Sequence, residues 1–433
     1  MPGRRKCADL ITSYIELTEE TEPRLILRMA CIISGIASVM QRKIFLPWGD
    51  MFFYPNMYIV LVGPPAARKG TAMAPIRRML DRIGVTMAAD ESSKQRLVQI
   101  LRDSIATDIT PTGAQCIHCS TTIHAAELTV FLGYNNMNLL TYLNDWFDCR
   151  DTFRYSTIAR EDETISNVWV NMLGATTPTL LQQALPIEAV GAGFTSRTFF
   201  VFAADKAKVV VMPSSPPGLF DAVCHDMEHL MALAGPFQYS EDFLALYADW
   251  RQTSDNIDMH DFRLNHYVDR RATHFMKLAM IFSVSRSDEL VLRPADFTRA
   301  KTFMETCERV MPRVFEGMGA NVFADVQARI MSFIRLRKRT TEEELTRMFK
   351  NDLMFRDLQA VLQTLQAGGE ISIGTSGNIQ LKSNRSATDE QPGATSEVEE
   401  GGKDNRPGHI RTRPARSDVP PDGGSSPHDI LPS

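Results

Sequence analysis

The sequence predicts an α/β protein built on a parallel sheet, with helices before and after it. Between residues 58 and 204, apolar runs typical of buried strands alternate with stretches of helical spacing. One run leads into a loop that starts with glycine and a helix that begins near Lys69. Further helical patterns lie before residue 50 and from about 217 to 320. We expect strands over 58–62, 116–123, 168–173 and 198–203, and helices over 71–83, 92–106 and 138–147.

Five segments follow from changes in pattern and composition. We expect a helical leader over 1–50, the α/β core over 51–210, a helical lid over 211–320, a winged-helix unit over 321–383 and a tail over 384–433. The fourth segment has three helical stretches followed by a hairpin pattern, which is the winged-helix order. The tail is rich in Gly, Pro, Ser and charge with almost no aromatic residues, so we expect it to be disordered.

Composition excludes some classes of protein. With 433 residues, 44% of them hydrophobic, the chain can bury a large core in two to three domains. The net charge of −5 does not demand nucleic acid, so a local basic face would have to provide that binding. Seven cysteines at irregular spacing, an odd number, indicate a reducing cytosol. No apolar run approaches the roughly 20 residues of a membrane span, and the N-terminus lacks a signal core, so we expect a soluble cytoplasmic protein without a membrane partner.

The loop after residue 62 resembles a P-loop, G-x-x-x-x-G-K-[ST]. Gly63 and Lys69 have the separation of that pattern, in which backbone N–H groups and the lysine bind the phosphates of ATP. Arg68 replaces the second glycine, and Gly70 stands where the Mg²⁺-binding hydroxyl belongs. Either Thr71 supplies that hydroxyl from a shifted helix start, or metal binding is weak and hydrolysis slow.

Two residues at strand ends are candidates for catalysis. Hydrolysis needs a carboxylate that orients water, and we expect it at the end of a strand beside the P-loop strand. Glu127 is the only acid directly after strand 116–123, although the aspartate of a standard Walker B element is missing. The alternative is a surface glutamate. Thr176 ends strand 168–173 and could sense the γ-phosphate, but Thr-Thr-Pro178 is also a normal helix start.

Arginines form a second group of candidates. Arg197 precedes strand 198–203 after a glycine-rich loop, where its guanidinium could reach the nucleotide of a neighbouring subunit as an arginine finger. An intramolecular salt bridge is the alternative. Arg270 and Arg271 open a lid helix, and because adjacent helical residues face different ways, at most one of them should bind phosphate. A solvated helix end is the alternative there.

A local basic excess marks the winged-helix unit as a candidate DNA-binding region. Arg337, Lys338 and Arg356 are among its cations, and Arg160 lies on a predicted hairpin over 154–166 that could line a central channel. These side chains would contact backbone phosphates, which makes binding sensitive to salt and weakly sequence-specific. The alternative for the unit over 321–383 is protein docking.

Taken together, the motifs resemble a known family over roughly residues 8 to 310. They are Tyr54-Pro-Asn-Met-Tyr58, the loop 63–71, His124-Ala-Ala-Glu-Leu128 with Phe131-Leu-Gly133, Leu173-Gly-Ala-Thr-Thr-Pro178 and Gly193-Phe-Thr-Ser-Arg197. This series resembles the phage and prophage P-loop ATPases of unassigned function that often form the helicase-like C-terminal half of primase–helicase proteins. The order of Lys69, Glu127, Thr176, Arg197 and Arg271 along the chain is also similar to that of AAA+ and superfamily-three replicative helicases.

The resemblance implies an AAA+-like fold that uses ATP and Mg²⁺. It matches Arg197 to the trans-acting arginine and Arg271 to the lid sensor, while Gly70 and the missing Walker B aspartate depart from the pattern. It further implies a hexamer-like homo-oligomeric ring acting on single-stranded or forked DNA, with a primase or other replication protein as partner, in a bacterial or phage-infected cell.

Two functions from different classes are therefore expected. The first is an ATP-dependent DNA helicase or translocase in phage-type DNA replication. The second is a DNA-binding replication initiator or loader that nucleotide switches with little hydrolysis, which Gly70 and the incomplete Walker B element favour. An inactive ATPase fold that serves as a scaffold is a third possibility.

Overall fold

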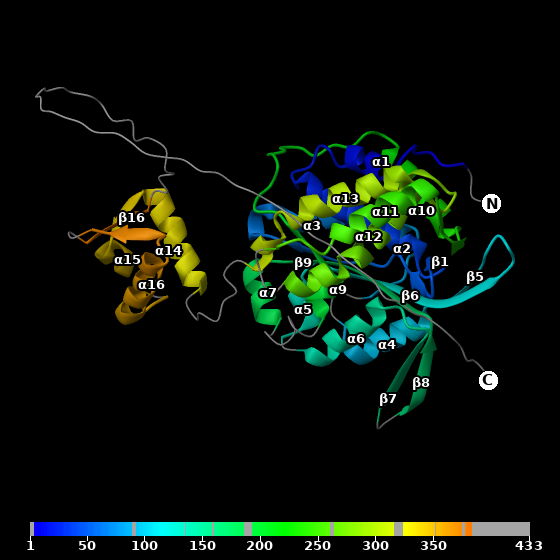
Figure 1. Ribbon diagram of the computed structural model, residues 1–433, viewed down its shortest axis with the longest axis horizontal. Coiled ribbons are helices and arrows are strands. Elements are labelled where there is room, and N and C mark those ends of the chain that lie inside the picture. The colour runs from blue at the N-terminus through cyan, green and yellow to red at the C-terminus, as the bar shows by residue number, and fades with distance from the viewer. Residues whose placement is uncertain are drawn as a thin grey trace, which may run out of the picture. The chain divides into compact units, whose positions relative to one another are not determined.

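The computed structural model describes residues 4–88, 92–134, 136–157, 160–185, 193–259, 264–315, 324–350, 352–374 and 377–382. The strands of its main sheet are β3 (Tyr58–Val62), β4 (Met87–Ala88), β5 (Ile105–Ile109), β6 (Gln115–Ala125), β9 (Val168–Thr176) and β10 (Thr198–Phe202). The parallel strands stand in the order β10-β3-β9-β6-β4. β5 pairs antiparallel with β6, and Figure 1 shows these two strands side by side. The predicted parallel α/β core is confirmed.

Helices surround this sheet. They are α1 (Leu10–Leu17), α2 (Leu25–Met40), α3 (Lys69–Arg82), α4 (Lys94–Asp103), α5 (Leu128–Leu132), α6 (Met137–Phe147), α7 (Pro178–Ala184), α9 (Phe194–Arg197), α10 (Leu219–Met231), α11 (Glu241–Thr253), α12 (Asn265–Arg286) and α13 (Pro294–Glu308), with the short 3-10 helices η1 (Pro65–Ala67) and η3 (Met311–Phe315). Short strands complete this part: β1 (Ile44–Trp48), β2 (Met51–Phe53), β11 (Gly235–Pro236), β12 (Gln238–Tyr239) and β13 (Val291–Leu292). None of the described helices is long and apolar enough to cross a membrane.

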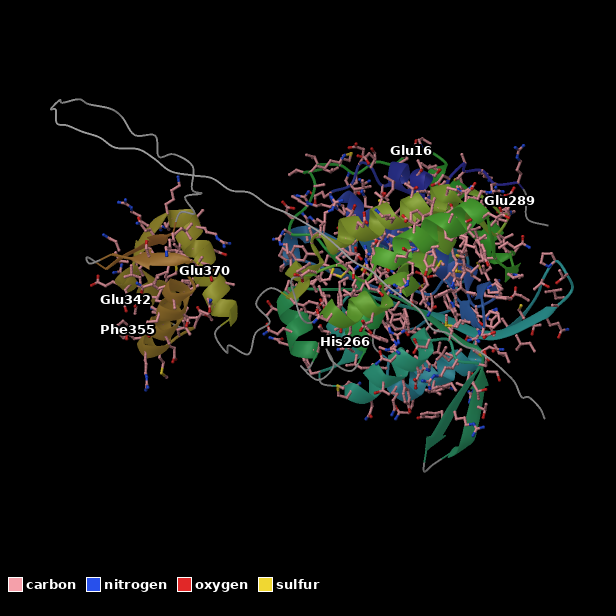
Figure 2. All side chains as sticks on the ribbon, viewed as in Figure 1. Glu16, His266, Glu289, Glu342, Phe355 and Glu370 are labelled. Carbon is pink, nitrogen blue, oxygen red and sulfur yellow. The ribbon has the colours of Figure 1, made fainter. Side chains whose placement is uncertain are left out.

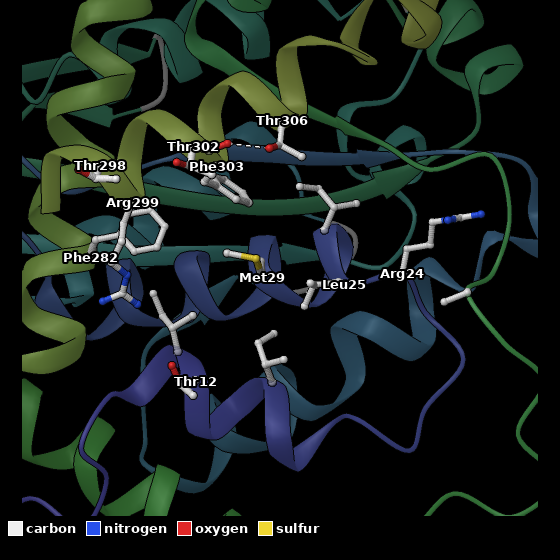
Figure 3. Close-up of a pocket in the computed structure, with 14 residues that line it drawn as sticks. Thr12, Arg24, Leu25, Met29, Phe282, Thr298, Arg299, Thr302, Phe303 and Thr306 are labelled. Carbon is white, nitrogen blue, oxygen red and sulfur yellow. Dashed lines mark hydrogen bonds between the residues drawn. The ribbon is translucent and has the colours of Figure 1, made fainter. Parts of the chain in front are cut away.

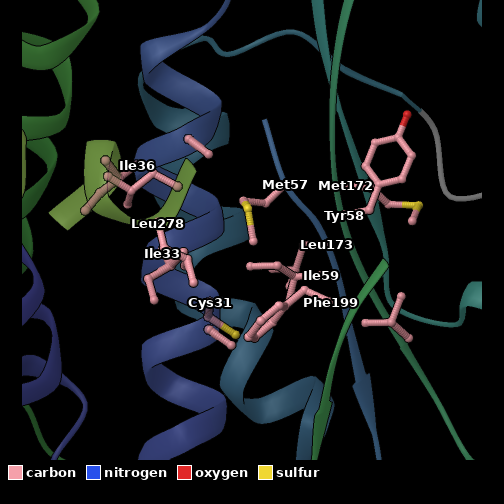
Figure 4. Packing of buried hydrophobic residues seen from close by; sticks show 14 of the residues in the cluster. Cys31, Ile33, Ile36, Met57, Tyr58, Ile59, Met172, Leu173, Phe199 and Leu278 are labelled. Atoms are coloured by element: carbon pink, nitrogen blue, oxygen red, sulfur yellow. The ribbon is translucent and has the colours of Figure 1, made fainter. Parts of the chain in front are cut away.

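Opposite faces of the sheet carry different helices. In β9, Asn171 donates hydrogen bonds to Ser34 of α2, whereas the hydroxyl of Tyr58 in β3 donates to the Leu143 carbonyl of α6. Because Tyr58 pairs with Met172, the neighbour of Asn171, these contacts belong to opposite faces. Figure 4 shows the α2 side of the core. There the fully buried Ile33 of α2, Ile59 of β3, Leu173 of β9, Phe199 of β10 and Leu278 of α12 belong to one hydrophobic cluster.

One hydrophobic cluster joins the leader, the sheet and the lid. It contains Leu10 of α1, Val60 of β3 and Phe303 of α13, all almost completely buried. Burial of this kind is the main favourable term in folding. The leader, the α/β core and the lid up to residue 315 therefore share a single core.

The segment from residue 324 has a separate core. It consists of α14 (Ala324–Arg337), β14 (Arg339–Thr341), α15 (Glu342–Phe349), α16 (Phe355–Ala367), β15 (Ile371–Ile373) and β16 (Asn378–Leu381). The strands stand in the order β14-β16-β15, and Leu345, Leu362 and Ile371 pack inside. Phe355, at the start of α16, is 54% exposed (Figure 2). The predicted order of three helices and a hairpin is present, β14 was not predicted, and the tail over 384–433 lies outside the described residues.

Candidate functional site

The loop between β3 and α3 starts at a position that only glycine can occupy. A Cβ atom on Gly63 would lie 2.2 Å from the carbonyl oxygen of Ala203, which follows β10. The Gly63 N–H donates to the carbonyl oxygen of Thr176 at the end of β9 (3.3 Å). Gly63 thus fixes the loop against both neighbouring strands. At Gly70, by contrast, a Cβ atom would enter open space, so packing does not require glycine there.

Lys69 is the first residue of α3, and its side chain turns back over the loop. The ammonium donates to the carbonyl oxygens of Gly63 (2.6 Å) and Pro64 (3.1 Å). Partial burial lowers the pKa of Lys69, and the negative charge of Glu127 partly offsets this effect. Lys69 follows β3 and Glu127 follows β6, and both strands run parallel in the same sheet, so the two residues lie at the edge where the carboxyl ends of the strands meet.

Glu127 caps the short helix α5 that follows β6. Its Oε1 accepts hydrogen bonds from the hydroxyl of Thr129 (2.9 Å) and from the Thr129 N–H (3.4 Å). The expectation that this carboxylate stands on a strand beside β3 is wrong, because β9 lies between β3 and β6. The register still brings Glu127 close to the level of the loop, since Ala125 pairs with Gly174, two residues before the end of β9.

Thr176 and Thr177 have different environments. Thr177 caps α7, because its hydroxyl accepts a hydrogen bond from the Leu180 N–H (3.2 Å). Thr176 is completely buried at the end of β9, beside Gly63, and its hydroxyl donates to the Thr177 carbonyl (3.4 Å). Helix capping therefore explains Thr177 and leaves Thr176 as the polar residue at the tip of the strand beside β3.

The candidate Mg²⁺ ligand, Thr71, is exposed in the first turn of α3. Within the described ranges, no three His, Cys, Asp or Glu side chains form a group that could hold a metal ion. The hydroxyl of Thr71 and the carboxylate of Glu127 are among the oxygens near the loop. Oxygen donors suit Mg²⁺, which usually binds through one or two protein ligands together with phosphate oxygens and water.

Arg68 ties the loop to the leader. Its backbone occupies the N-cap position of α3 in the left-handed conformation, with φ at 63°. Its Nε lies 2.6 Å from the carboxylate of Glu22. The same carboxylate binds the ammonium of Lys206 at 2.7 Å, and this hydrogen bond lowers the pKa of Glu22. Neither Glu22 nor Lys206 was predicted as a site residue, because their proximity to the loop arises only from the tertiary fold.

Arg197 lies at the opposite edge of the sheet from the loop. It directly precedes β10, and Thr198 pairs with Tyr58 at the start of β3. Its guanidinium binds Asp148 at 2.6 Å, and Arg270 binds the same carboxylate at 3.1 Å. Burial opposes ionisation of Asp148, but the hydrogen bond from Arg197 and both positive charges leave its pKa below the ordinary value. The salt bridge considered as an alternative for Arg197 is thus present in the described chain.

Arg271 does not lie at the loop. It is 4% exposed and forms paired hydrogen bonds of 2.7 and 2.9 Å with the carboxylate of Glu308, while it also donates to the Ser254 carbonyl. Its neighbour Arg270 is bound to Asp148 at the other edge of the sheet from the loop. The expectation that Arg271 binds the nucleotide of its own subunit is therefore corrected, because its charge is committed to a buried carboxylate.

The candidate DNA-binding residues are described only in part. The predicted hairpin is confirmed as β7 (Thr152–Thr157) and β8 (Arg160–Ser166), which pair antiparallel. The backbone of Arg160 opens β8, but its side chain lies outside the described part of the hairpin. In the segment from residue 324, Arg337, Lys338 and Arg356 are all exposed.

A large apolar pocket lies between the leader and the lid (Figure 3). Its volume is about 870 Å³, and its walls come from α1, α2, α12 and α13, with Met29, Phe282 and Phe303 among the lining residues. Arg24 and Ala207 also line it. These two residues are close in sequence to Glu22 and Lys206, so the pocket shares a rim with the segments that contact Arg68.

Comparison with known proteins adds no relative. No protein-family model matches the chain, and no curated protein is significantly similar to it.

Proposed function

We propose that this protein is an AAA+-like P-loop ATPase that works as an ATP-dependent DNA helicase or translocase in phage-type replication. The observation that carries the nucleotide-binding part is the convergence of three groups at one edge of the sheet. These are the loop from Gly63, the ammonium of Lys69 and the carboxylate of Glu127. Ligands of open α/β sheets bind at this carboxyl edge.

Each group has a role in that proposal. Backbone N–H groups at the start of α3 and the ammonium of Lys69 bind the phosphates, with Lys69 exchanging its loop carbonyls for phosphate oxygens. Glu127 orients the attacking water. Thr176 is completely buried beside Gly63, so it would contact the γ-phosphate only after a shift of the loop. Bound Mg²⁺ would neutralise charge on the phosphate oxygens, and Thr71 is the hydroxyl that would hold it.

The pocket between the leader and the lid suits the nucleobase. It is mostly apolar and lies next to the residues that contact Arg68, which is the arrangement expected of a small-molecule site with its polar end at the loop. The pocket would then determine which base is preferred, and the loop would determine how tightly the triphosphate binds.

The DNA-dependent part of the proposal relies on the segment from residue 324 and on the hairpin β7–β8. This segment has the helix and strand order of a winged helix, and its residues Arg337, Lys338 and Arg356 are exposed. Arg197 stands at the far edge of the sheet from the loop of its own subunit, which suits a role in trans within a ring. Single-stranded or forked DNA is the proposed substrate, and a primase is a proposed partner.

A nucleotide-switched initiator or loader is the second candidate. Two observations favour it: Glu127 is engaged by Thr129, and no described aspartate stands beside it at the end of β6. A switch needs only nucleotide-dependent binding to DNA, whereas a motor needs turnover that the strand stimulates.

ATP hydrolysis with and without single-stranded DNA, with particle mass measured in the same buffer, tests the proposal. A motor predicts stimulated hydrolysis by an oligomer. Nucleotide-dependent DNA binding without stimulated hydrolysis would select the switch. Absence of any nucleotide binding would contradict both functions.

A further inference from the structure

Three charged side chains, which we call the Glu22 cluster, join the loop to the leader and to the segment after β10. The cluster consists of Glu22, Arg68 and Lys206, and the carboxylate receives one cation on each oxygen, at 2.6 and 2.7 Å. The Glu22 side chain is only 15% exposed, whereas Arg68 and Lys206 are 46% and 32% exposed. The two cations therefore converge on a sheltered anion beside the loop while their own charges remain open to solvent.

The segment after β10 is held by more contacts than those of the Glu22 carboxylate. The Ala207 N–H donates to the backbone carbonyl of Glu22 at 2.9 Å, a contact that any residue would make. Two further ion pairs attach the same segment, Arg24 with Asp205 and Lys208 with Glu20. The Glu22 carboxylate adds a 3.4 Å hydrogen bond from the Val210 N–H, and beyond that it pairs a loop arginine with Lys206.

A guanidinium and an ammonium that bind two oxygens of a carboxylate can bind two oxygens of a phosphate in the same way. Arg68 belongs to the loop itself, so any polyphosphate on the backbone N–H groups of α3 would lie beside its guanidinium. A carboxylate and a phosphate then compete for the same two cations, and the carboxylate also repels the phosphate charge.

We infer that Arg68 and Lys206 form a cation pair for the phosphates of a bound nucleoside polyphosphate, and that Glu22 competes with those phosphates for the pair. This inference rests on the proposed nucleotide-binding function of the loop. Lys206 thereby becomes a phosphate ligand from outside the loop, and Glu22 sets the nucleotide affinity. When the nucleotide binds, Arg68 and Lys206 transfer from Glu22 to the phosphates.

The two partners of one ion pair should then have opposite effects. Lys206→Met removes a phosphate ligand and should weaken nucleotide binding, whereas Glu22→Gln removes the competitor and should strengthen it. We expect changes of roughly three- to fivefold, the size typical of a charge pair that is partly exposed to solvent. If the ion pair only held the fold together, both variants would bind more weakly or both would bind equally well.

The neighbouring pair Lys208 and Glu20 provides matched controls. It bridges the same two segments at 3.1 Å, but no loop residue joins it. The experiment titrates mant-ATP with Mg²⁺ into the full chain, its Lys69→Ala variant, Glu22→Gln, Lys206→Met, Glu20→Gln and Lys208→Met, with melting temperatures recorded in parallel. The inference predicts tighter binding by Glu22→Gln, weaker binding by Lys206→Met and no change in the two controls.

The outcomes separate this inference from the proposed function. Wild-type chain that binds no mant-ATP, or binding that persists in Lys69→Ala, overturns the nucleotide site and the inference with it. Binding that depends on Lys69, together with unchanged or weaker binding by Glu22→Gln at an unchanged melting temperature, overturns the inference alone. If Glu22→Gln lowers the melting temperature, the affinity of Lys206→Met tests the inference instead. Unchanged mant-ATP affinity in Lys206→Met then overturns the inference.

Discussion

Replacement of Arg271 by methionine should damage the stability of the protein and spare its nucleotide affinity. The Arg271 and Glu308 side chains are only 5% and 3% exposed, and they form an ion pair at 2.7 Å. The hydroxyl of Tyr267 donates a hydrogen bond to the same carboxylate. Removal of one partner leaves a buried carboxylate without its counter-charge, which costs about 3–5 kcal/mol. At roughly 2 °C per kcal/mol for a unit of this size, the unfolding midpoint should fall by roughly 6–10 °C.

Tryptophan fluorescence is a suitable assay for this prediction. All four tryptophans lie between residues 48 and 250, within the part of the chain that shares the main core, and Trp250 lies 5.2 Å from the Arg271 guanidinium. The exposed pair of Arg293 and Glu289 provides a control, since Arg293→Ala should move the midpoint by less than about 2 °C. The double variant Arg271→Met with Glu308→Leu should recover most of the loss, because it leaves no unpaired charge. A normal midpoint together with lost mant-ATP affinity in Arg271→Met would refute this reasoning and restore a sensor role.

Three further predictions concern the loop, the carboxylate and a buried histidine. Lys69→Ala should abolish ATP binding in equilibrium titrations, and wild-type affinity in that variant would contradict the site. Glu127→Gln should keep ATP affinity but lower steady-state hydrolysis at least roughly a hundredfold, the usual effect of a lost general base, and unchanged turnover would exclude that role. Burial lowers the pKa of His274 to about 3. Since the unfolded chain binds this proton near its ordinary pKa of about 6.5, unfolding experiments should find stability falling as pH drops from about 6.5 toward 3, and less steeply in His274→Asn.

Features encoded by neighbouring residues were predictable from the sequence. The strand, loop and helix around Lys69 follow from a short apolar run, a glycine and a helical pattern, and all three are present. The hairpin over 154–166 was predicted in the same way from two β-like runs and a polar tip, and β7 and β8 form it. The hairpin depends on contacts between residues close in sequence, whereas β3 also pairs with the distant strands β9 and β10, which its apolar run did not identify.

Contacts between distant residues explain what the sequence analysis missed. The helix predicted over 92–106 ends at Asp103, and the next residues form β5, because β6 extends beyond the parallel sheet and offers them a partner. Arg271 looked like a lid residue, but its carboxylate partner lies 37 residues further along the chain. Glu22 and Lys206 are separated by 184 residues, so no local pattern could place them together beside the loop.

The position of Arg197 decides how many subunits an active site needs. Arg197 precedes β10, whose five residues run parallel to β3 at about 3.3 Å each, so roughly 15 Å of sheet separates it from the loop end of the same subunit. That distance is too long for a side chain, so Arg197 does not reach a phosphate bound at the loop of its own subunit, and its action on a neighbouring subunit's nucleotide is the proposal to be tested.

Mixing variants tests this arrangement. Arg197→Ala should lower turnover and keep ATP affinity, and adding Lys69→Ala should restore part of the activity, because some interfaces then combine an intact loop with an intact arginine. Lys69→Ala mixed with Glu127→Gln should stay inactive, since both changes fall on the loop side of the interface. A fully active monomer, or equal activity in both mixtures, would exclude a role in trans and leave Arg197 as the partner of Asp148 alone.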